Sequence, residues 1–332
     1  MPLGRLAQVL RDVHDPGDSR LLVGPDTLDD AGVVRVADDP SVPALVQTVD
    51  FFPPVVDDPY LYGAIAAANA LSDVYAMGGR PLSALTLAGF PKDFDSDWID
   101  AIMRGGFEKV REAGAVIAGG HTVESELQFG FAVTGLVDPA VVTANTGARE
   151  GDRVYLTKPL GMGTMTTAAK FGKIDWETMR PAAEQMATLN AESARAMVAA
   201  GARAATDVTG FGLMGHGRNL ARGSGGTLVL EADALPIFPG ALELARDGVA
   251  SGGSKRGRAN LAGQVHVDEG IDEGLVRIVY DAETSGGLLV VLGEAESARF
   301  EQECRASGQL AVRVGRIAAR SEVAVALVAA DG

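Results

Sequence analysis

The sequence contains a single cysteine, Cys304, among its 332 residues. One cysteine excludes an internal disulfide framework and a cysteine-based zinc site. Residues 294–305 have helical character and Cys304 follows Phe300 by four positions, so we expect its thiol to pack in the core. The scarcity of cysteine is typical of a protein of the reducing cytoplasm, which is the location that we predict.

Long apolar runs and signal sequences are also missing. No stretch of about 18 apolar residues occurs, and residues 1–12 lack the apolar segment of a secretory signal peptide. Neither a membrane-spanning helix nor a signal peptide is therefore predicted. Aromatic residues make up 5% of the chain and hydrophobic residues 47%, so we expect cores of Ala, Val, Leu and Ile.

Positive charge is in short supply. The chain has 29 Lys and Arg against 44 Asp and Glu, which gives a net charge of −15 and a pI near 4.7. This balance argues against non-specific binding to nucleic acid and to anionic membranes. An acidic surplus commonly serves solubility alone. The alternative is that some carboxylates bind divalent cations, which would let an acidic protein accept a polyanion such as ATP.

Several well-known catalytic and binding motifs are absent. The Walker pattern G-x-x-x-x-G-K-[ST] and the G-x-S-x-G elbow do not occur, which excludes a P-loop and a nucleophile elbow. Gly161 and Gly163 follow a strand-like run, but the third glycine of a dinucleotide fingerprint is missing. The histidines are scattered, which argues against a zinc site. They are His14, His121, His216 and His266.

The chain is long enough for two ordinary domains, and we place their boundary near residue 150. A polar cluster at residues 145–152 separates them, giving a first domain at 1–150 and a second at 151–332. Apolar periodicity predicts α-helices and β-strands in both, hence two α+β domains. The expected helices span 1–13, 58–77, 96–113 and 180–200. The expected strands span 33–36, 44–49, 82–87, 115–118, 129–137 and 153–157, and 251–258 is expected to be a loop.

Aspartates beside apolar runs are the most informative feature that is present. Asp73 lies in an Ala-rich helical segment, four residues after Asn69 and on the same face. A carboxylate there costs stability unless a cation pairs with it. Between Val33 and Gly79 the only Lys or Arg is Arg35, so a metal ion is the expected partner. A helix cap or an Asx-turn is the alternative for any single member of the set. The set is Asp29, Asp30, Asp50, Asp73 and Asp207.

A second group of candidate residues follows the strand-like run at 115–118. Gly119 and Gly120 precede His121 and Thr122, so backbone N–H groups and a hydroxyl are available for phosphate oxygens. A plain turn explains the same four residues equally well.

Taken together, eight segments resemble selenophosphate synthetase, the selenide, water dikinase family, in the order that the family has them. Any one of them is weak, but eight in order over nearly the whole chain are specific. The segments are 28–31 (LDDA), 48–53 (TVDFFP), 66–79 (AAANALSDVYAMGG), 118–122 (AGGHT), 132–135 (AVTG), 156–161 (LTKPLG), 206–213 (TDVTGFGL) and 284–289 (TSGGLL).

The resemblance implies a fold and an activity. The fold is that of aminoimidazole ribonucleotide synthetase, with an N-terminal α/β domain that dimerises through its sheet and a C-terminal α+β domain. The activity converts ATP, selenide and water into selenophosphate, AMP and phosphate. The implied magnesium ligands are Asp30, Asp73 and Asp207. The implied nucleotide contacts are Thr27, Leu28, Asp29, Asp50, Asp73, Gly120, His121 and Thr122.

The chain departs from the family at its start. The family has a glycine-rich N-terminal segment with a reactive Cys or selenocysteine and a following Lys, and neither is present here. We expect that the protein extends upstream and that a selenocysteine codon was read as a stop. The alternative is a short paralogue that binds ATP without making selenophosphate. The DNA before the first codon distinguishes them, and an in-frame TGA or Cys codon followed by a Lys codon supports the first.

Two other functions stay open at this point. One is another ATP-using enzyme of the same superfamily, such as thiamine-monophosphate kinase or the hydrogenase maturation dehydratase. The other is a non-catalytic nucleotide-binding protein. The sequence motifs around Asp50 and Asp73 favour the dikinase over the related enzymes.

Overall fold

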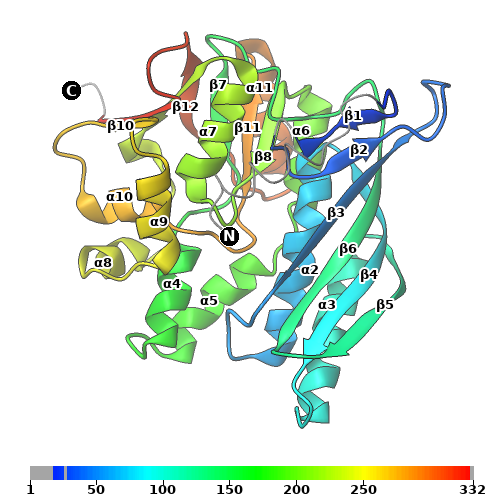
Figure 1. The fold of residues 1–332 in the computed structure, drawn as a ribbon. Helices are drawn as coiled ribbons and strands as arrows, with labels where there is room; N and C mark the ends of the chain where they lie inside the picture. Colours follow the sequence, from blue (N-terminus) through cyan, green and yellow to red (C-terminus); the bar gives the residue numbers. More distant parts are fainter. Residues whose placement is uncertain (1–17, 26–27, 330–332) are drawn as a thin grey trace.

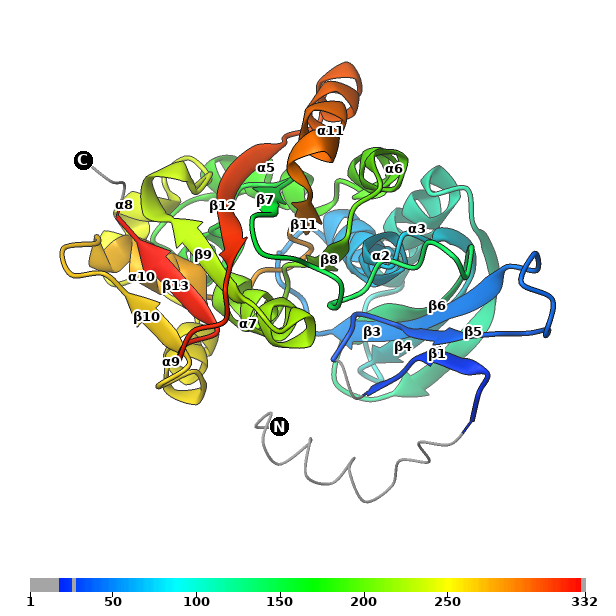
Figure 2. The same ribbon diagram turned by 90° about the horizontal axis from the view of Figure 1, so that it is seen from above.

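Two β-sheets, each covered by helices, lie side by side in the computed structural model of the chain (Figures 1 and 2). The structure describes residues 18–25 and 28–329. The helix expected over 1–13 and the candidate Thr27 lie outside the described residues. Within the described part, no helix is both long and apolar enough to cross a bilayer.

The first sheet has six strands in the order β1-β2-β3-β6-β4-β5. All neighbouring strands pair antiparallel except β4 and β5, which are parallel. The strands are β1 (Leu21–Val23), β2 (Gly32–Val34), β3 (Ala44–Phe52), β4 (Arg80–Phe90), β5 (Val116–Glu124) and β6 (Gln128–Val137).

Two helices cover one face of this sheet, α2 (Pro59–Ala76) and α3 (Ser96–Glu112) (Figure 2). Asp58 caps α2 by accepting a hydrogen bond from the Leu61 backbone N–H at 2.8 Å, as an N-cap aspartate does. The two helices touch backbone to backbone, because a Cβ on Gly105 would lie 2.0 Å from the carbonyl oxygen of Tyr60.

The alternation of side chains along β3 decides which of its residues reach the interior. Ala44 and Val46 are buried against the helices, while Val49 and Phe51 are exposed on the outer face. Asp50 falls on the inner face, so the pleat directs its carboxylate toward α2. Among the described residues, no helix of this domain covers the outer face.

The second sheet has seven strands in the order β10-β13-β9-β12-β7-β11-β8. The strands are β7 (Arg153–Leu156), β8 (Ala204–Asp207), β9 (Thr227–Glu231), β10 (Val265–Val267), β11 (Leu288–Leu292), β12 (Val312–Ala318) and β13 (Val325–Val328). The helices around it are α4 (Met162–Lys170), α5 (Trp176–Met186), α6 (Ala191–Ala200), α7 (Gly212–Ser224), η2 (Ala232–Ala234), α8 (Ala241–Arg246), α9 (Gly252–Asn260), α10 (Glu273–Tyr280) and α11 (Glu294–Ala306).

The edge strand β8 and helices α5 and α6 of the second half lie against α2 (Figure 2). Helix α2 is therefore buried on nearly all sides, which explains its Ala-rich composition, because small side chains allow close approach on every face. This contact brings Asp73 of α2 near the end of β8.

Most predicted elements are confirmed, two are wrong, and one strand is longer than expected. The single helix expected over 180–200 is two helices, α5 and α6. They are separated at Asn190, whose side chain donates to the Ser72 hydroxyl and the Gly286 carbonyl oxygen. The expected loop at 251–258 belongs to helix α9, which Ser251 caps. The strand expected at 115–118 continues to Glu124, because residues 119–122 pair with β4.

Candidate functional site

Three of the predicted aspartates converge from separate parts of the chain. Asp30 lies two residues before β2, Asp73 lies in α2, and Asp207 ends β8. Burial raises the pKa of Asp30 and of Asp73 well above the usual value, and the neighbouring charge of Asp207 raises both further. The three carboxyls therefore form one electrostatic cluster, which we call the acidic cluster.

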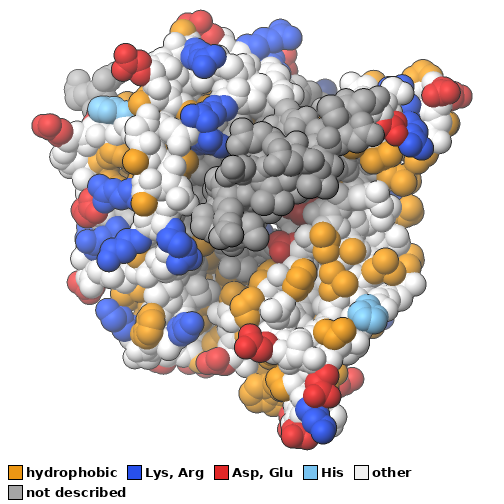
Figure 3. Space-filling view, in the orientation of Figure 1, with side chains coloured by type: hydrophobic (Ala, Val, Ile, Leu, Met, Phe, Trp, Pro, Cys, Tyr) orange, Lys and Arg blue, Asp and Glu red, His pale blue; other side chains and the backbone are white. Residues whose placement is uncertain are grey.

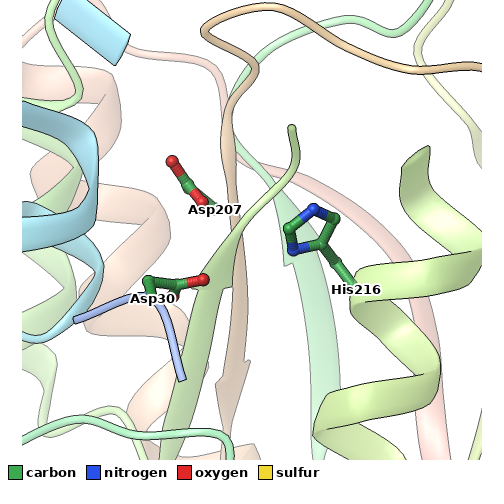
Figure 4. A group of neighbouring side chains, drawn as sticks. All are labelled: Asp30, Asp207 and His216. Atoms are coloured by element: carbon green, nitrogen blue, oxygen red, sulfur yellow. The ribbon is translucent and has the colours of Figure 1, made fainter. Parts of the chain in front are cut away.

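The acidic cluster holds carboxylate oxygens that have no hydrogen-bond partner among the described residues. These buried oxygens are Oδ1 and Oδ2 of Asp207 and Oδ2 of Asp30. The other oxygen of Asp30 accepts a hydrogen bond from the Thr206 hydroxyl at 2.8 Å, and the Thr48 hydroxyl donates to Asp73. Figure 4 shows the carboxylates of Asp30 and Asp207 close together at the end of β8.

Such a cluster is unfavourable without a cation. Buried carboxylates cost several kcal/mol each as anions unless charge and hydrogen bonds compensate them, to order of magnitude. The buried cation nearby, Lys158, donates from Nζ to the carbonyl oxygens of Thr188 and Ser285 at 2.7 and 2.9 Å. Burial lowers the pKa of Lys158 to about 7, against the opposing effect of Asp207.

The chemistry of the cluster fits a hard divalent cation. Burial raises the pKa of Asp207 to about 6 and the charge of Asp50 adds to it, while the positive charge of Lys158 opposes it. The pKa values of Asp30, Asp73 and Asp207 are thus all raised, and a metal ion that binds these carboxyls competes with protons for them. Carboxylate oxygens without protein partners are the ligands that Mg²⁺ uses, together with waters and phosphates.

Asp50 lies beside the acidic cluster, and Asn69 links it by hydrogen bonds to the second domain. The Asn69 amide donates to Asp50, and its carbonyl oxygen accepts from the Ser285 backbone N–H at 2.8 Å. Burial raises the pKa of Asp50. Ser285 has a φ of 51°, a conformation that non-glycine residues rarely adopt, so Asn69 and Lys158 together hold a strained turn in place.

The segment at Leu28 and Asp29 connects to the domain boundary. The Asn145 backbone N–H donates to Asp29 at 2.5 Å, and the Asn145 amide donates to the Leu28 carbonyl oxygen at 2.8 Å. Leu28 is exposed with a φ of 54°. These contacts fix the backbone just before Asp30 and so place its carboxylate.

The candidates Gly120, His121 and Thr122 do not join the acidic cluster within one chain. All three lie exposed in the edge strand β5. Gly120 is in the same row of the sheet as Asp50, but β6 and β4 lie between their strands. Three strand spacings separate them by roughly 14 Å.

Sequence reasoning missed His216, Thr206 and Lys158. His216 is buried, and one of its ring nitrogens, one carboxylate oxygen of Asp30 and one of Asp207 lie within 4.8 Å of one another. Its position in the first turns of α7, directly after the loop that follows Asp207, is the only sequence signal that could have indicated it.

The chain matches two family models. Residues 28–137 match the AIR synthase related protein, N-terminal domain, and residues 149–328 match the AIR synthase related protein, C-terminal domain.

Curated proteins resemble the chain over most of its length. A selenide, water dikinase of Geobacter metallireducens is 46% identical over 312 residues, which cover 93% of this chain and 90% of that protein. Selenide, water dikinase 2 of Peptoclostridium acidaminophilum is 42% identical over 97% of this chain and 92% of that protein.

Solved structures share the fold at lower identity. A crystal structure of a Thermus thermophilus protein matches with a TM-score of 0.75 and 22% identity, covering 98% of this chain and 96% of that chain. AaThiL complexed with AMPPCP and TMP matches with a TM-score of 0.71 and 18% identity, covering 98% and 93%. The two-domain α/β architecture is therefore that of the AIR synthase-like proteins, as the sequence predicted.

Proposed function

Because the chain belongs to the selenide, water dikinase family, we propose that it is the phosphotransferase that makes selenophosphate from selenide and ATP, with AMP and phosphate as co-products. The observation that carries this proposal is the acidic cluster. The fold brings carboxylates from both domains together and leaves oxygens of Asp30 and Asp207 without a hydrogen-bond partner among the described residues, so they could bind a cation.

In this proposal Asp30, Asp73 and Asp207 hold Mg²⁺. The metal would neutralise charge on the phosphates of ATP, which is its usual contribution to phosphoryl transfer. The chain's own residues orient the carboxylates: the Thr48 hydroxyl holds Asp73, and the Thr206 hydroxyl holds Asp30. Asp50 sits beside the cluster on the inner face of β3, where we place it as a nucleotide contact together with Thr27, Leu28 and Asp29.

We propose a homodimer that uses the outer face of the first sheet. This face exposes large apolar side chains, among them Val49, Phe51 and Leu85, each 47–58% exposed. Figure 3 shows hydrophobic side chains gathered over these strands. His121 shares this outer face, because it lies in the same row of the sheet as Phe51. A second copy seated here would therefore contact the Gly120–Thr122 segment and bring it toward a nucleotide site.

Replacing Val49 and Phe51 with Asp should convert the dimer to a monomer, because each subunit would bury two negative charges at the interface. Light scattering coupled to size-exclusion chromatography measures the mass directly. Replacing Arg111 of α3 with Asp, on the opposite side of the sheet, is the control and should leave the dimer intact. A wild-type protein that is monomeric at micromolar concentrations would refute this interface.

The 332-residue chain should bind Mg–ATP but form little AMP in a selenide-dependent manner. Its one cysteine, Cys304, is buried in α11, and burial raises the pKa of its thiol to about 11, so it does not supply a reactive thiolate. Joining a segment with the family's Cys and Lys to Met1 should restore turnover. The same fusion with Ser in place of that Cys is the control, and AMP is measured by chromatography.

Full turnover by the 332-residue chain would contradict the proposal that the Cys and Lys of the family's N-terminal segment are essential. Absence of Mg–ATP binding would contradict the proposed function itself.

The buried free thiol also fits the cytoplasmic location that we propose.

A further inference from the structure

His216 is a buried polar side chain whose two ring nitrogens both have partners. The backbone N–H of Thr209 donates to Nε2 at 3.2 Å. Nε2 therefore carries a lone pair, and the proton of the neutral ring is on Nδ1. Phe211 packs against the imidazole with ring centroids 5.5 Å apart and helps to fix its plane. The ring thus has one tautomer and one orientation.

The Nδ1 side of His216 faces the hydroxyl of Thr206. These two atoms are 3.4 Å apart, so Nδ1–H can donate to Thr206 Oγ1. The hydroxyl oxygen then acts as acceptor toward His216, and its own hydrogen is directed away from the ring. The nearest acceptor is Asp30 Oδ1 at 2.8 Å, and the carbonyl oxygen of Asp207 is farther, at 3.1 Å.

The result is a directed chain of hydrogen bonds from α7 to Asp30. It joins Thr206 of the second sheet to a carboxylate 176 positions earlier in the chain. Asp30 Oδ1 is the accepting end, and Oδ2 is the oxygen left without a partner among the described residues. The chain of bonds therefore decides which oxygen of Asp30 is available and where it points.

His216 itself is poorly suited to bind a hard cation. A ligand atom of each of Asp30, Asp207 and His216 lies within 4.8 Å of the others, which by distance alone would allow a three-residue metal site (Figure 4). A metal on Nε2 would displace the Thr209 N–H, and a metal on Nδ1 would displace the contact to Thr206. Mg²⁺ also prefers oxygen to imidazole nitrogen.

We propose that His216 and Thr206 are positioning residues that orient Asp30 for the divalent cation, with His216 acting through the Thr206 hydroxyl. The proposal rests on the proposed function, because it presumes that Asp30 is a metal ligand. Outer partners of metal ligands typically contribute about 10–100-fold to metal affinity.

The test measures Mn²⁺ binding in the presence of a non-hydrolysable ATP analogue, by the electron paramagnetic resonance signal of free Mn²⁺. Thr206→Val keeps the shape of the side chain and removes the hydroxyl, and it should weaken Mn²⁺ binding about 10–100-fold. Thr206→Ser keeps the hydroxyl and should bind within about threefold of wild type. Thr227→Val is the matched control, since Thr227 of β9 is also a buried threonine and its hydroxyl donates to Ser321 and to the Val323 carbonyl oxygen, outside the acidic cluster.

The His216 variants test the direction of the chain of bonds. His216→Leu should weaken Mn²⁺ binding about tenfold, and His216→Asn, which retains an N–H donor near the Nδ1 position, should recover most of the loss. Combining His216→Leu with Thr206→Val should weaken binding no further than Thr206→Val alone, because both changes break one chain. Thermal unfolding of each variant confirms that the protein compared is folded.

Three results would overturn the inference. Wild-type Mn²⁺ affinity in Thr206→Val, with binding lost in Asp30→Asn, would refute the chain of bonds and leave the metal site standing. Independent, additive losses from His216→Leu and Thr206→Val would instead make His216 a direct ligand. If Asp30→Asn itself binds Mn²⁺ normally, Asp30 is not a ligand, and both the metal role of Asp30 and this inference fail.

Discussion

Replacing Asp73 with Asn should weaken Mg–ATP binding by on the order of 100-fold or more, because even an outer partner of a metal ligand contributes about 10–100-fold. The substitution removes a charge from the acidic cluster and changes the side-chain volume little. The amide oxygen of Asn can still accept the hydrogen bond that the Thr48 hydroxyl donates to Asp73. We therefore expect the fold to be retained.

Without metal, the Asp73→Asn protein should be at least as stable as wild type at pH 8. Removing the charge of Asp73 relieves its repulsion from Asp207 and Asp30, the same interaction that, after burial, raises the pKa of Asp73. Calorimetric titration gives the Mg–ATP affinity, and thermal unfolding with and without metal gives the stability.

The matched control is Asp152→Asn. Asp152 is also buried, but it forms an ion pair with Arg203 at 2.5 Å and has no part in the acidic cluster. This variant should lose stability and keep its Mg–ATP affinity. Failure of Asp73→Asn to fold would mean that Asp73 is a structural residue of α2, and the metal assignment would be withdrawn.

The second large effect is a dependence of metal affinity on pH. The pKa of Asp207 is raised to about 6 in the folded protein, chiefly by burial. A metal ion must displace a proton from this carboxyl below pH 6 and displaces none above it. Lowering the pH from about 7 to about 5 should therefore weaken Mg²⁺ binding about tenfold through Asp207 alone. Asp30 and Asp73, whose pKa values are also raised, add to this loss.

The sign of the stability effect follows from the same shift. The raised pKa of Asp207 means that the folded state holds its proton more tightly than the unfolded state, whose carboxyl titrates near pH 4. Asp207 therefore contributes stability that is present below about pH 4 and is lost as the pH rises to about 6. Bound Mg²⁺ replaces the proton as the compensating charge. The rise in melting temperature on adding Mg²⁺ and nucleotide should accordingly be larger at pH 7 than at pH 5.

Asp207→Asn is the control for the pH experiment. It removes the proton that competes with the metal, so the tenfold contribution from this carboxyl should disappear while the weaker residual binding remains. Magnesium affinity that is equal at pH 5 and pH 7 in the wild-type protein would contradict the proposed site. Measuring affinity with a non-hydrolysable nucleotide keeps turnover out of the comparison.

The first domain shows how far local sequence patterns reach. Apolar periodicity predicted helices at 58–77 and 96–113, and the structure has α2 at Pro59–Ala76 and α3 at Ser96–Glu112. In the second domain the same reasoning failed at 180–200. Apolar spacing continues across residues 187–190 there, while Asn190 leaves the helix to bond Ser72 and Gly286. Periodicity carries no information on such distant partners.

The sequence by itself determined the kind of chemistry. An aspartate at position 73 among Ala and Leu, with hardly a cation nearby in sequence, already required a positive partner, because a buried charge is costly wherever the helix lies. The order of the eight segments determined the family. Both conclusions depend only on residue types and on which residues are neighbours in sequence, and the amino-acid sequence gives both.

Only the tertiary structure decided which residues meet. The packing of β8 against α2 brings Asp207 to Asp73, and the Thr206 hydroxyl reaches Asp30 across 176 positions. The order of the strands places β6 and β4 between β3 and β5, which keeps Gly120 away from the acidic cluster. These contacts depend on how whole elements pack, and the free energy of packing is shared among many side chains far apart in sequence. No short segment of the chain therefore specifies them.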